Sequence, residues 1–205
     1  MILFFQMLMW ISCFHGTPSN NTEIEIWEVL NYSTIEVLGQ TNINNFTCKI
    51  PSYQKEKDIL HCEKKSDGKV NVKSILTIPV TDFDCYHRIM TKDLQKTLKA
   101  QVYPNLYIYI KNFTDLPSQY KKNKSILSNT EIQLAGVNRT FKIEFVSSPA
   151  QNGYLEIKGE VDMHFTDFNL TPPSKLGGTI KVKNELKVKV RLLLKRVQPL
   201  YRSKN

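Results

Sequence analysis

The stretch IKVKNELKVKV, residues 180–190, decides the fold of this 205-residue chain. Apolar residues occupy every second position from Ile180 to Val190, and lysines fill most of the positions between them. Successive side chains of a β-strand point to opposite faces, so this period predicts a strand with one face on a core and a basic face in water. Asn184 is the one polar residue on the apolar face.

The same alternation of apolar and polar residues recurs in other segments of the chain, and turn-forming residues separate these segments. GYLEIKGEVDMHF, residues 153–165, predicts a second long strand, and shorter apolar runs predict others near residues 35–37, 46–48, 76–80, 106–110 and 141–145. Asp67-Gly68 and Asn152-Gly153 supply the positive φ of two-residue hairpins. Residues 90–100 predict one short helix with Leu94 and Leu98 on one face, and the polar residues 121–129 predict a loop. An antiparallel, all-β meander is therefore expected.

The N-terminal residues MILFFQMLMWISCFHG carry no charge and precede the polar run Thr17–Asn21. Their apolar core is shorter than the ~20 residues that a membrane-spanning helix needs. We predict a signal peptide over residues 1–16 and a single domain over residues 17–205. The WISC segment also loosely resembles a lipoprotein cleavage box, which leaves lipidation of Cys13 open.

The formal net charge is +9. Lys and Arg are spread along the strands and do not collect on one helix, which favours a solvated exterior over nucleic-acid binding. Attraction to an anionic membrane surface remains compatible with this charge.

Candidate catalytic chemistry is sparse. Asp82, Asp84, Cys85 and His87 stand together, but at a strand end where polar loop residues are ordinary, so we predict no metal site. His164 falls on the outward phase of its strand. No nucleophile-elbow, phosphate-loop or dinucleotide-binding motif occurs, and we predict a binding protein without cofactor or enzymatic activity.

Several segments, in this order, resemble the YceI-like family of exported bacterial proteins, in its short form with an Asn-rich first hairpin. Thr34–Cys48 is similar to the family's opening hairpin, and Leu76–Cys85 to the segment before its helix. Tyr103-Pro104, Leu134–Thr140 and Phe165–Phe168 resemble later motifs. The resemblance runs from about residue 34 to residue 197.

The resemblance implies a lipocalin-like, eight-stranded antiparallel barrel in the periplasm or cell envelope, holding a polyisoprenoid or similar lipid. The alternative is a structural or adhesive envelope domain whose interior is filled by its own side chains. The inward-phase residues are the candidate lipid contacts: Leu76, Ile78, Leu106, Ile108, Phe141, Ile143, Phe145, Leu155, Ile157, Val161, Met163, Phe165, Val182 and Val188.

Without Cys13 the chain keeps three cysteines, Cys48, Cys62 and Cys85. In an oxidising compartment an odd number predicts one disulfide and one free thiol. The family resemblance implies that Cys48 pairs with Cys85, because the short form often carries Cys at both positions. A Cys48–Cys62 bridge across a hairpin is the alternative.

Overall fold

The computed structural model describes residues 22–53, 58–119, 125–175 and 178–197. The predicted signal peptide and Cys13 lie outside these ranges. Within them the chain is mostly β-structure with one α-helix. None of the described helices has the length and apolar composition to span a bilayer.

The described elements are β1 (Glu23–Val29), β2 (Thr34–Thr41), β3 (Asn45–Ile50), β4 (Ile59–Lys64), β5 (Val70–Lys73), β6 (Leu76–Pro79), α1 (Arg88–Thr97), β7 (Asn105–Ile110), β8 (Asn112–Phe113), β9 (Ser125–Leu134), β10 (Val137–Pro149), β11 (Leu155–His164), β12 (Ser174–Lys175) and β13 (Ile180–Val197). Four 3-10 turns join them: η1 (Val80–Asp82), η2 (Pro117–Gln119), η3 (Gln151–Gly153) and η4 (Phe165–Phe168).

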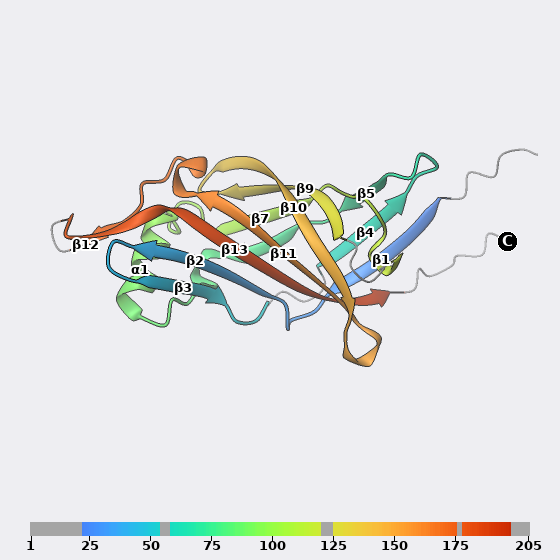
Figure 1. The fold of residues 1–205 in the computed structure, drawn as a ribbon, viewed down its shortest axis with the longest axis horizontal. Helices are drawn as coiled ribbons and strands as arrows, with labels where there is room; N and C mark the ends of the chain where they lie inside the picture. Colours follow the sequence, from blue (N-terminus) through green and yellow to red (C-terminus); the bar gives the residue numbers. More distant parts are fainter. Residues whose placement is uncertain (1–21, 54–57, 120–124, 176–177, 198–205) are drawn as a thin grey trace, which may run out of the picture.

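Strand β13 organises the sheet. It pairs with β11 along one edge, and along the other with β2 through its first half and β1 through its second (Figure 1). Val188 lies opposite Val161 of β11 and Val37 of β2, so the apolar phase read from the sequence is shared across the three strands. The pairing with β2 shifts register between Val182 and Leu186, around Asn184, whose amide is bonded to Thr166 of η4.

The sheet closes on itself at one end. There β13, β1, β4, β5 and β8 are paired in turn, and the residues flanking β8 bond to β9 through Lys111 N to Asn129 O (3.1 Å) and Thr114 N to Leu127 O (3.0 Å). We call this the closed end. At the opposite, open end, β3 and β6 are sheet edges, and the segment carrying α1 lies beside β2 and β3 (Figure 1).

The prediction of eight strands is wrong, because the described residues form thirteen. Part of the excess arises from bent strands: Ser74 and Ile75 separate β5 from β6, and Lys111 separates β7 from β8. Strands β1, β4 and β5 were not anticipated. The curled antiparallel sheet is nonetheless consistent with a lipocalin-like fold.

Two local predictions also change. The helix spans 88–97 instead of 90–100, and Lys99 just after it adopts a positive φ of 54°, which helical backbone does not allow. Residues 125–129, predicted as loop, form the start of β9, with Ile126 and Ser128 buried inside. Hairpins do turn at both predicted places, and Gly68, Asn152 and Gly153 have positive φ. The two-residue turns are wrong, because residues 65–69 and 150–154 connect the paired strands and Asp67 does not have a positive φ.

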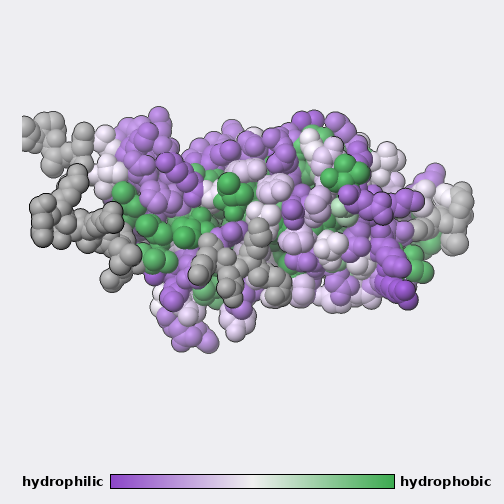
Figure 2. Space-filling model, turned by 180° about the vertical axis from the view of Figure 1, so that it is seen from behind, coloured by the Kyte–Doolittle hydropathy of each residue, from purple (hydrophilic) through white to green (hydrophobic). Residues whose placement is uncertain are grey.

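On the face seen in Figure 2, hydrophilic residues are interspersed with groups of hydrophobic ones. Lysines of β13 lie on the exterior and form ion pairs there. Lys187 contacts Asp162 at 3.2 Å, and Lys189 contacts Glu160 at 3.5 Å. The outward basic row read from the sequence is thus partly neutralised by acidic residues of β11.

Candidate functional site

An apolar inner chamber lies inside the sheet toward the open end. Its cavity volume is about 90 Å³. The walls come from β2, β6, β7, β9, β10, β11 and β13, and α1 adds Leu94 and Leu98. Thr130 and His164 are the polar residues among its lining. Such a chamber offers contact to hydrocarbon and few partners to a polar group.

The buried hydroxyls along the interior already have partners. Thr130 and Ser128 share a hydrogen bond at 3.0 Å, and Ser74 Oγ accepts from Ile110 N at 3.1 Å. Ser147 Oγ donates to Pro117 O at 3.2 Å. Because buried polar groups that are satisfied within the protein gain little from a ligand, the interior favours an apolar guest.

A second, outer chamber of about 240 Å³ opens beyond the first. The β2–β3 turn and the start of α1 enclose it together with Pro173, Ile180 and Val182. Thr41, Asn44, His87 and Asp93 give it a partly polar lining. Leu94 and Phe165 line both chambers. We call this pair the throat, since it separates the apolar interior from the more polar mouth.

Nine predicted contacts line the inner chamber: Leu76, Leu106, Ile108, Ile143, Phe145, Val161, Met163, Phe165 and Val188. Val182 lines the outer chamber instead. Ile78, Leu155 and Ile157 are buried in the core away from both chambers, and Phe141 packs on Phe168 with ring centroids 6.1 Å apart. Whether any of these residues touches a ligand stays a prediction.

Two aromatic rings fill space left by glycines. A Cβ at Gly159 would stand 2.7 Å from the Phe145 ring, and a Cβ at Gly39 would stand 2.2 Å from the Phe46 ring. Phe145 also meets Phe113 edge to face at 6.1 Å. Glycine therefore lets Phe145 lie across the barrel interior, where it bounds the inner chamber on the closed side.

The open end is held by a disulfide. Cys48 of β3 is bonded to Cys85, as the family resemblance implied, and Cys62 is a buried free thiol, so the Cys48–Cys62 alternative is wrong. Paired backbone bonds between Lys49 and Asp84 (2.8 and 2.9 Å) accompany the bridge. Together they fix the segment leading into α1 against the edge of β3.

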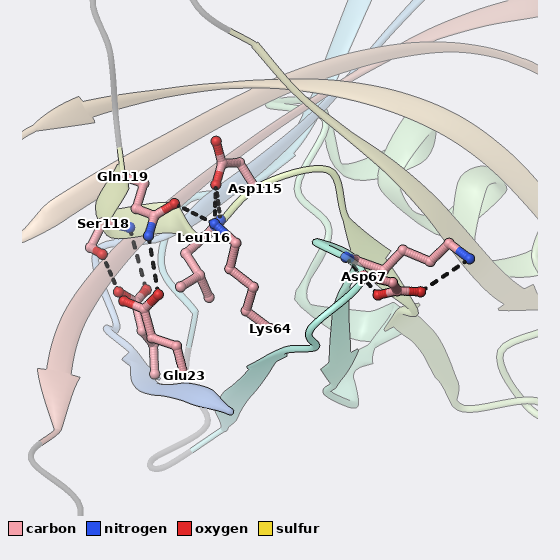
Figure 3. Close-up of polar contacts among 9 residues, drawn as sticks. Glu23, Lys64, Asp67, Asp115, Leu116, Ser118 and Gln119 are labelled. Atoms are coloured by element: carbon pink, nitrogen blue, oxygen red, sulfur yellow. Dashed lines mark hydrogen bonds and ion pairs between the residues drawn. The ribbon is translucent and has the colours of Figure 1, made fainter. Parts of the chain in front are cut away.

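At the closed end a polar network seals the barrel with η2 (Figure 3). Lys64 donates to Gln119 Oε1 at 2.7 Å and pairs with Asp115 at 3.3 Å, while Gln119 Nε2 donates to Glu23 at 3.2 Å. Leu116, just before η2, is fully buried. The turn thus inserts an apolar residue and surrounds it with paired polar groups.

Glu25 is the buried centre of this seal, with 1% of its surface exposed. It accepts hydrogen bonds from Trp27 Nε1 (3.0 Å), Ser118 N (3.3 Å) and Ser118 Oγ, and Arg196 lies 3.5 Å away. Burial, and secondly the charge of Glu25, raise the pKa of the neighbouring Cys62 thiol to about 12. The hydrogen bonds from Trp27 and Ser118, together with the nearby Arg196, stabilise the buried Glu25 carboxylate.

No metal site appears in the described ranges, where no three His, Cys, Asp or Glu side chains gather. Of the cluster considered for a metal, Cys85 is consumed by the disulfide. Asp84 Oδ1 accepts from Tyr86 N at 2.8 Å, an ordinary loop contact. The His164 side chain is exposed, as expected, with its Nδ1 3.5 Å from Asp167, although the residue also borders the inner chamber.

Sequence reasoning missed the throat residue Leu94 and the mouth residues Ile43, Phe46 and Ile89 as parts of the cavity. Leu94 was assigned to the buried face of the helix, which is correct, but nothing local to α1 shows which chamber that face covers. The apolar residues Ile43 and Ile89 at otherwise polar, exposed positions were the available signal.

Neither a scan against protein-family models nor a search of curated proteins found a match. Among solved structures, a polyisoprenoid-binding domain from Saccharophagus degradans, implicated in plant cell wall breakdown, superposes with a TM-score of 0.58 at 9% identity over 83% of this chain and 98% of that one. BcnA from Burkholderia cenocepacia gives 0.53 at 14% identity, over 78% and 95%.

A YceI protein from Campylobacter jejuni is also similar, with a TM-score of 0.45 at 14% identity over 63% of this chain and 72% of that one. At such identities the likeness concerns architecture. The chain therefore shares the fold of the polyisoprenoid-binding domain and of BcnA, the two neighbours that superpose best on it of these three.

Proposed function

We propose that this protein is an exported carrier that holds a polyisoprenoid or similar amphiphilic lipid in its two chambers, in the periplasm or cell envelope. The single observation that carries the proposal is an apolar inner chamber that shares two lining residues, Leu94 and Phe165, with a partly polar outer chamber. We assign the tail to the inner chamber and the head group to the mouth. No catalytic step is proposed.

The energetics favour a hydrocarbon tail. Each CH₂ group transferred from water into an apolar site contributes ~0.8 kcal/mol, so a tail of a few isoprene units binds without hydrogen bonds. His87 and the side-chain amide nitrogen of Asn44 at the mouth can bond to a polar head, whereas Thr41 Oγ1 is already bonded within its own turn. The polyisoprenoid-binding domain that shares this fold supports the ligand class.

The small size of the inner chamber favours a competing function, that of a structural or adhesive domain without a ligand. Pockets for small molecules commonly measure roughly 300–1,000 Å³, well above the 90 Å³ of this chamber. In the carrier, the throat side chains Leu94 and Phe165 shift to admit a tail. In the alternative, a structural or adhesive envelope domain, the interior stays filled by residues such as Phe145 and no ligand enters.

Native mass spectrometry of the protein purified from its own host, followed by organic extraction, separates the two functions. The carrier predicts a stoichiometric isoprenoid-like lipid that dissociates on activation. A protein that is reproducibly empty, and that takes up no added geranylgeranyl phosphate, would instead establish the filled, structural domain.

A further inference from the structure

Three exposed apolar side chains stand at the open end. Ile43 in the β2–β3 turn is 67% exposed, Tyr86 before α1 is 65% exposed and Ile89 in the first turn of α1 is 59% exposed. Ile43 and Ile89 also line the outer chamber. We call these three residues the rim, because they carry the apolar wall of the mouth out to the surface.

The rim is built into the fold. Thr41 Oγ1 accepts from the backbone amides of Ile43 (3.2 Å) and Asn44 (2.9 Å), which fixes the turn that presents Ile43. Asn42 joins the same turn to β13 through bonds of 2.9 Å to Thr179 O and Lys181 N. The exposure of Ile43 is therefore a feature of a rigid turn.

A basic stripe runs beside the rim. Arg88, Lys92 and Lys96 recur every four residues along α1, and all three are exposed. Side chains three or four apart share a helix face, so Ile89 lies next to Lys92. Asp93, the acidic residue of the helix, lines the outer chamber. The outer face of α1 thus combines positive charge with an exposed Ile.

We propose that the rim and the basic stripe dock the open end on an anionic phospholipid bilayer, with the mouth of the outer chamber facing the lipid. The inference rests on the proposed function, because a lipid carrier must load from a membrane. Lys and Arg near an anionic surface are attracted to its headgroups, and Ile and Tyr side chains partition into the interface. Charge complementarity selects this partner.

Exposed apolar side chains also occur elsewhere on the described surface. Leu127 of β9 and Val146 of β10 are 52% and 53% exposed but lie toward the closed end, away from both chambers. Lys65, Lys73 and Lys195 are exposed basic residues on or beside β4, β5 and β13, also outside both chambers. These two sets provide matched controls.

The test is co-sedimentation of the full chain with vesicles of phosphatidylcholine alone or mixed with phosphatidylglycerol. We compare wild type, the stripe variant Arg88→Gln/Lys92→Gln/Lys96→Gln, and the control Lys65→Gln/Lys73→Gln/Lys195→Gln, which removes the same charge. The stripe variant is expected to lose about tenfold or more in affinity for the anionic vesicles, whereas the control keeps most of it. Added salt is expected to weaken wild-type binding.

A second pair tests the rim: Ile43→Ser/Ile89→Ser is expected to reduce vesicle binding more than Leu127→Ser/Val146→Ser. Equal losses in the stripe variant and its control would show that only net charge acts, and would overturn the proposal, as would absence of binding to anionic vesicles. Uptake of geranylgeranyl phosphate is measured separately without vesicles. Its failure in a protein that still binds vesicles refutes the carrier and not the docking.

Discussion

The two ends of the molecule use the same sheet in opposite ways. At the closed end, Glu25 forms polar contacts with η2 and with Arg196 of β13, and Leu116 beside them is fully buried. At the open end, the space between the sheet edges is lined by apolar residues and held by one disulfide. The closed end is thus filled and bonded, whereas the open end holds cavities lined mainly by apolar residues.

The disulfide is expected to give the largest effect. It joins residues 37 positions apart, and closing a loop of that length stabilises a fold by about 4 kcal/mol in the chain-entropy account. Cys48→Ala/Cys85→Ala is expected to lower the free energy of unfolding by about this amount in urea titrations. Reductant should destabilise wild type and leave the variant unchanged. Equal sensitivity of both proteins would show that the open end does not depend on this bridge.

The seal at the closed end comes next. Glu25→Ala leaves the buried donor Trp27 Nε1 and the partly buried donor Ser118 N without their acceptor, which is expected to cost about 3 kcal/mol of unfolding free energy. Glu185→Ala, at an exposed position of β13 outside this network, is the control and should change stability by no more than about 0.5 kcal/mol. If both variants are equally stable, the network is not a seal.

The throat is expected to affect binding more than stability. Leu94→Glu places a carboxylate between the chambers, and we expect affinity for a fluorescent geranylgeranyl probe to fall about tenfold or more, because the charge loses solvent when the tail enters. Gln95→Glu adds the same charge on the neighbouring position outside both chambers and should leave affinity unchanged. Unaltered binding in Leu94→Glu would place the tail elsewhere.

The smallest effect is a pH dependence at the closed end. Burial raises the pKa of Cys62 from 9.0 to about 12, so the neutral thiol stabilises the fold fully below pH 9 and this stability is lost as pH rises toward 12. Between pH 8 and pH 10, wild type should lose about 1 kcal/mol more than Cys62→Ala. The raised pKa of Tyr53 acts in the same direction in both proteins and cancels in the comparison. Parallel pH profiles would contradict a buried, neutral thiol.

Sequence reasoning recovered the open end better than the closed end. Alternation in β11 and β13 is unambiguous, and it places Val161, Met163 and Val188 on the inner chamber. The segment EIEIWEV of β1 is ambiguous, because either phase carries apolar residues. The structure buries Trp27 and Val29 and with them Glu25, leaving Ile24 42% exposed. The larger Trp decides the phase, and Glu25 is tolerated only because η2, distant in sequence, supplies donors.

The strand count failed for a related reason. Short strands such as β5 and β8 hold too few residues to show a period, and they form because partners distant in the chain accept their backbone bonds. The throat is likewise a tertiary feature: the residue pattern puts Leu94 on the apolar face of the helix, but does not show that it lines the same two chambers as Phe165. The residue pattern along one strand shows which side chains point inward. The shape of a chamber depends on which strands and helices come together around it.

The most direct test of the open-end carrier is to locate the tail. A geranylgeranyl phosphate carrying a diazirine at the tail terminus is incubated with the full chain, photolysed, and the adducts are mapped by peptide mass spectrometry. The account predicts adducts on inner-chamber residues such as Met163, Phe165 and Val188, abolished by excess unlabelled geranylgeranyl phosphate. Adducts confined to the exterior or to the closed end around η2 would contradict it.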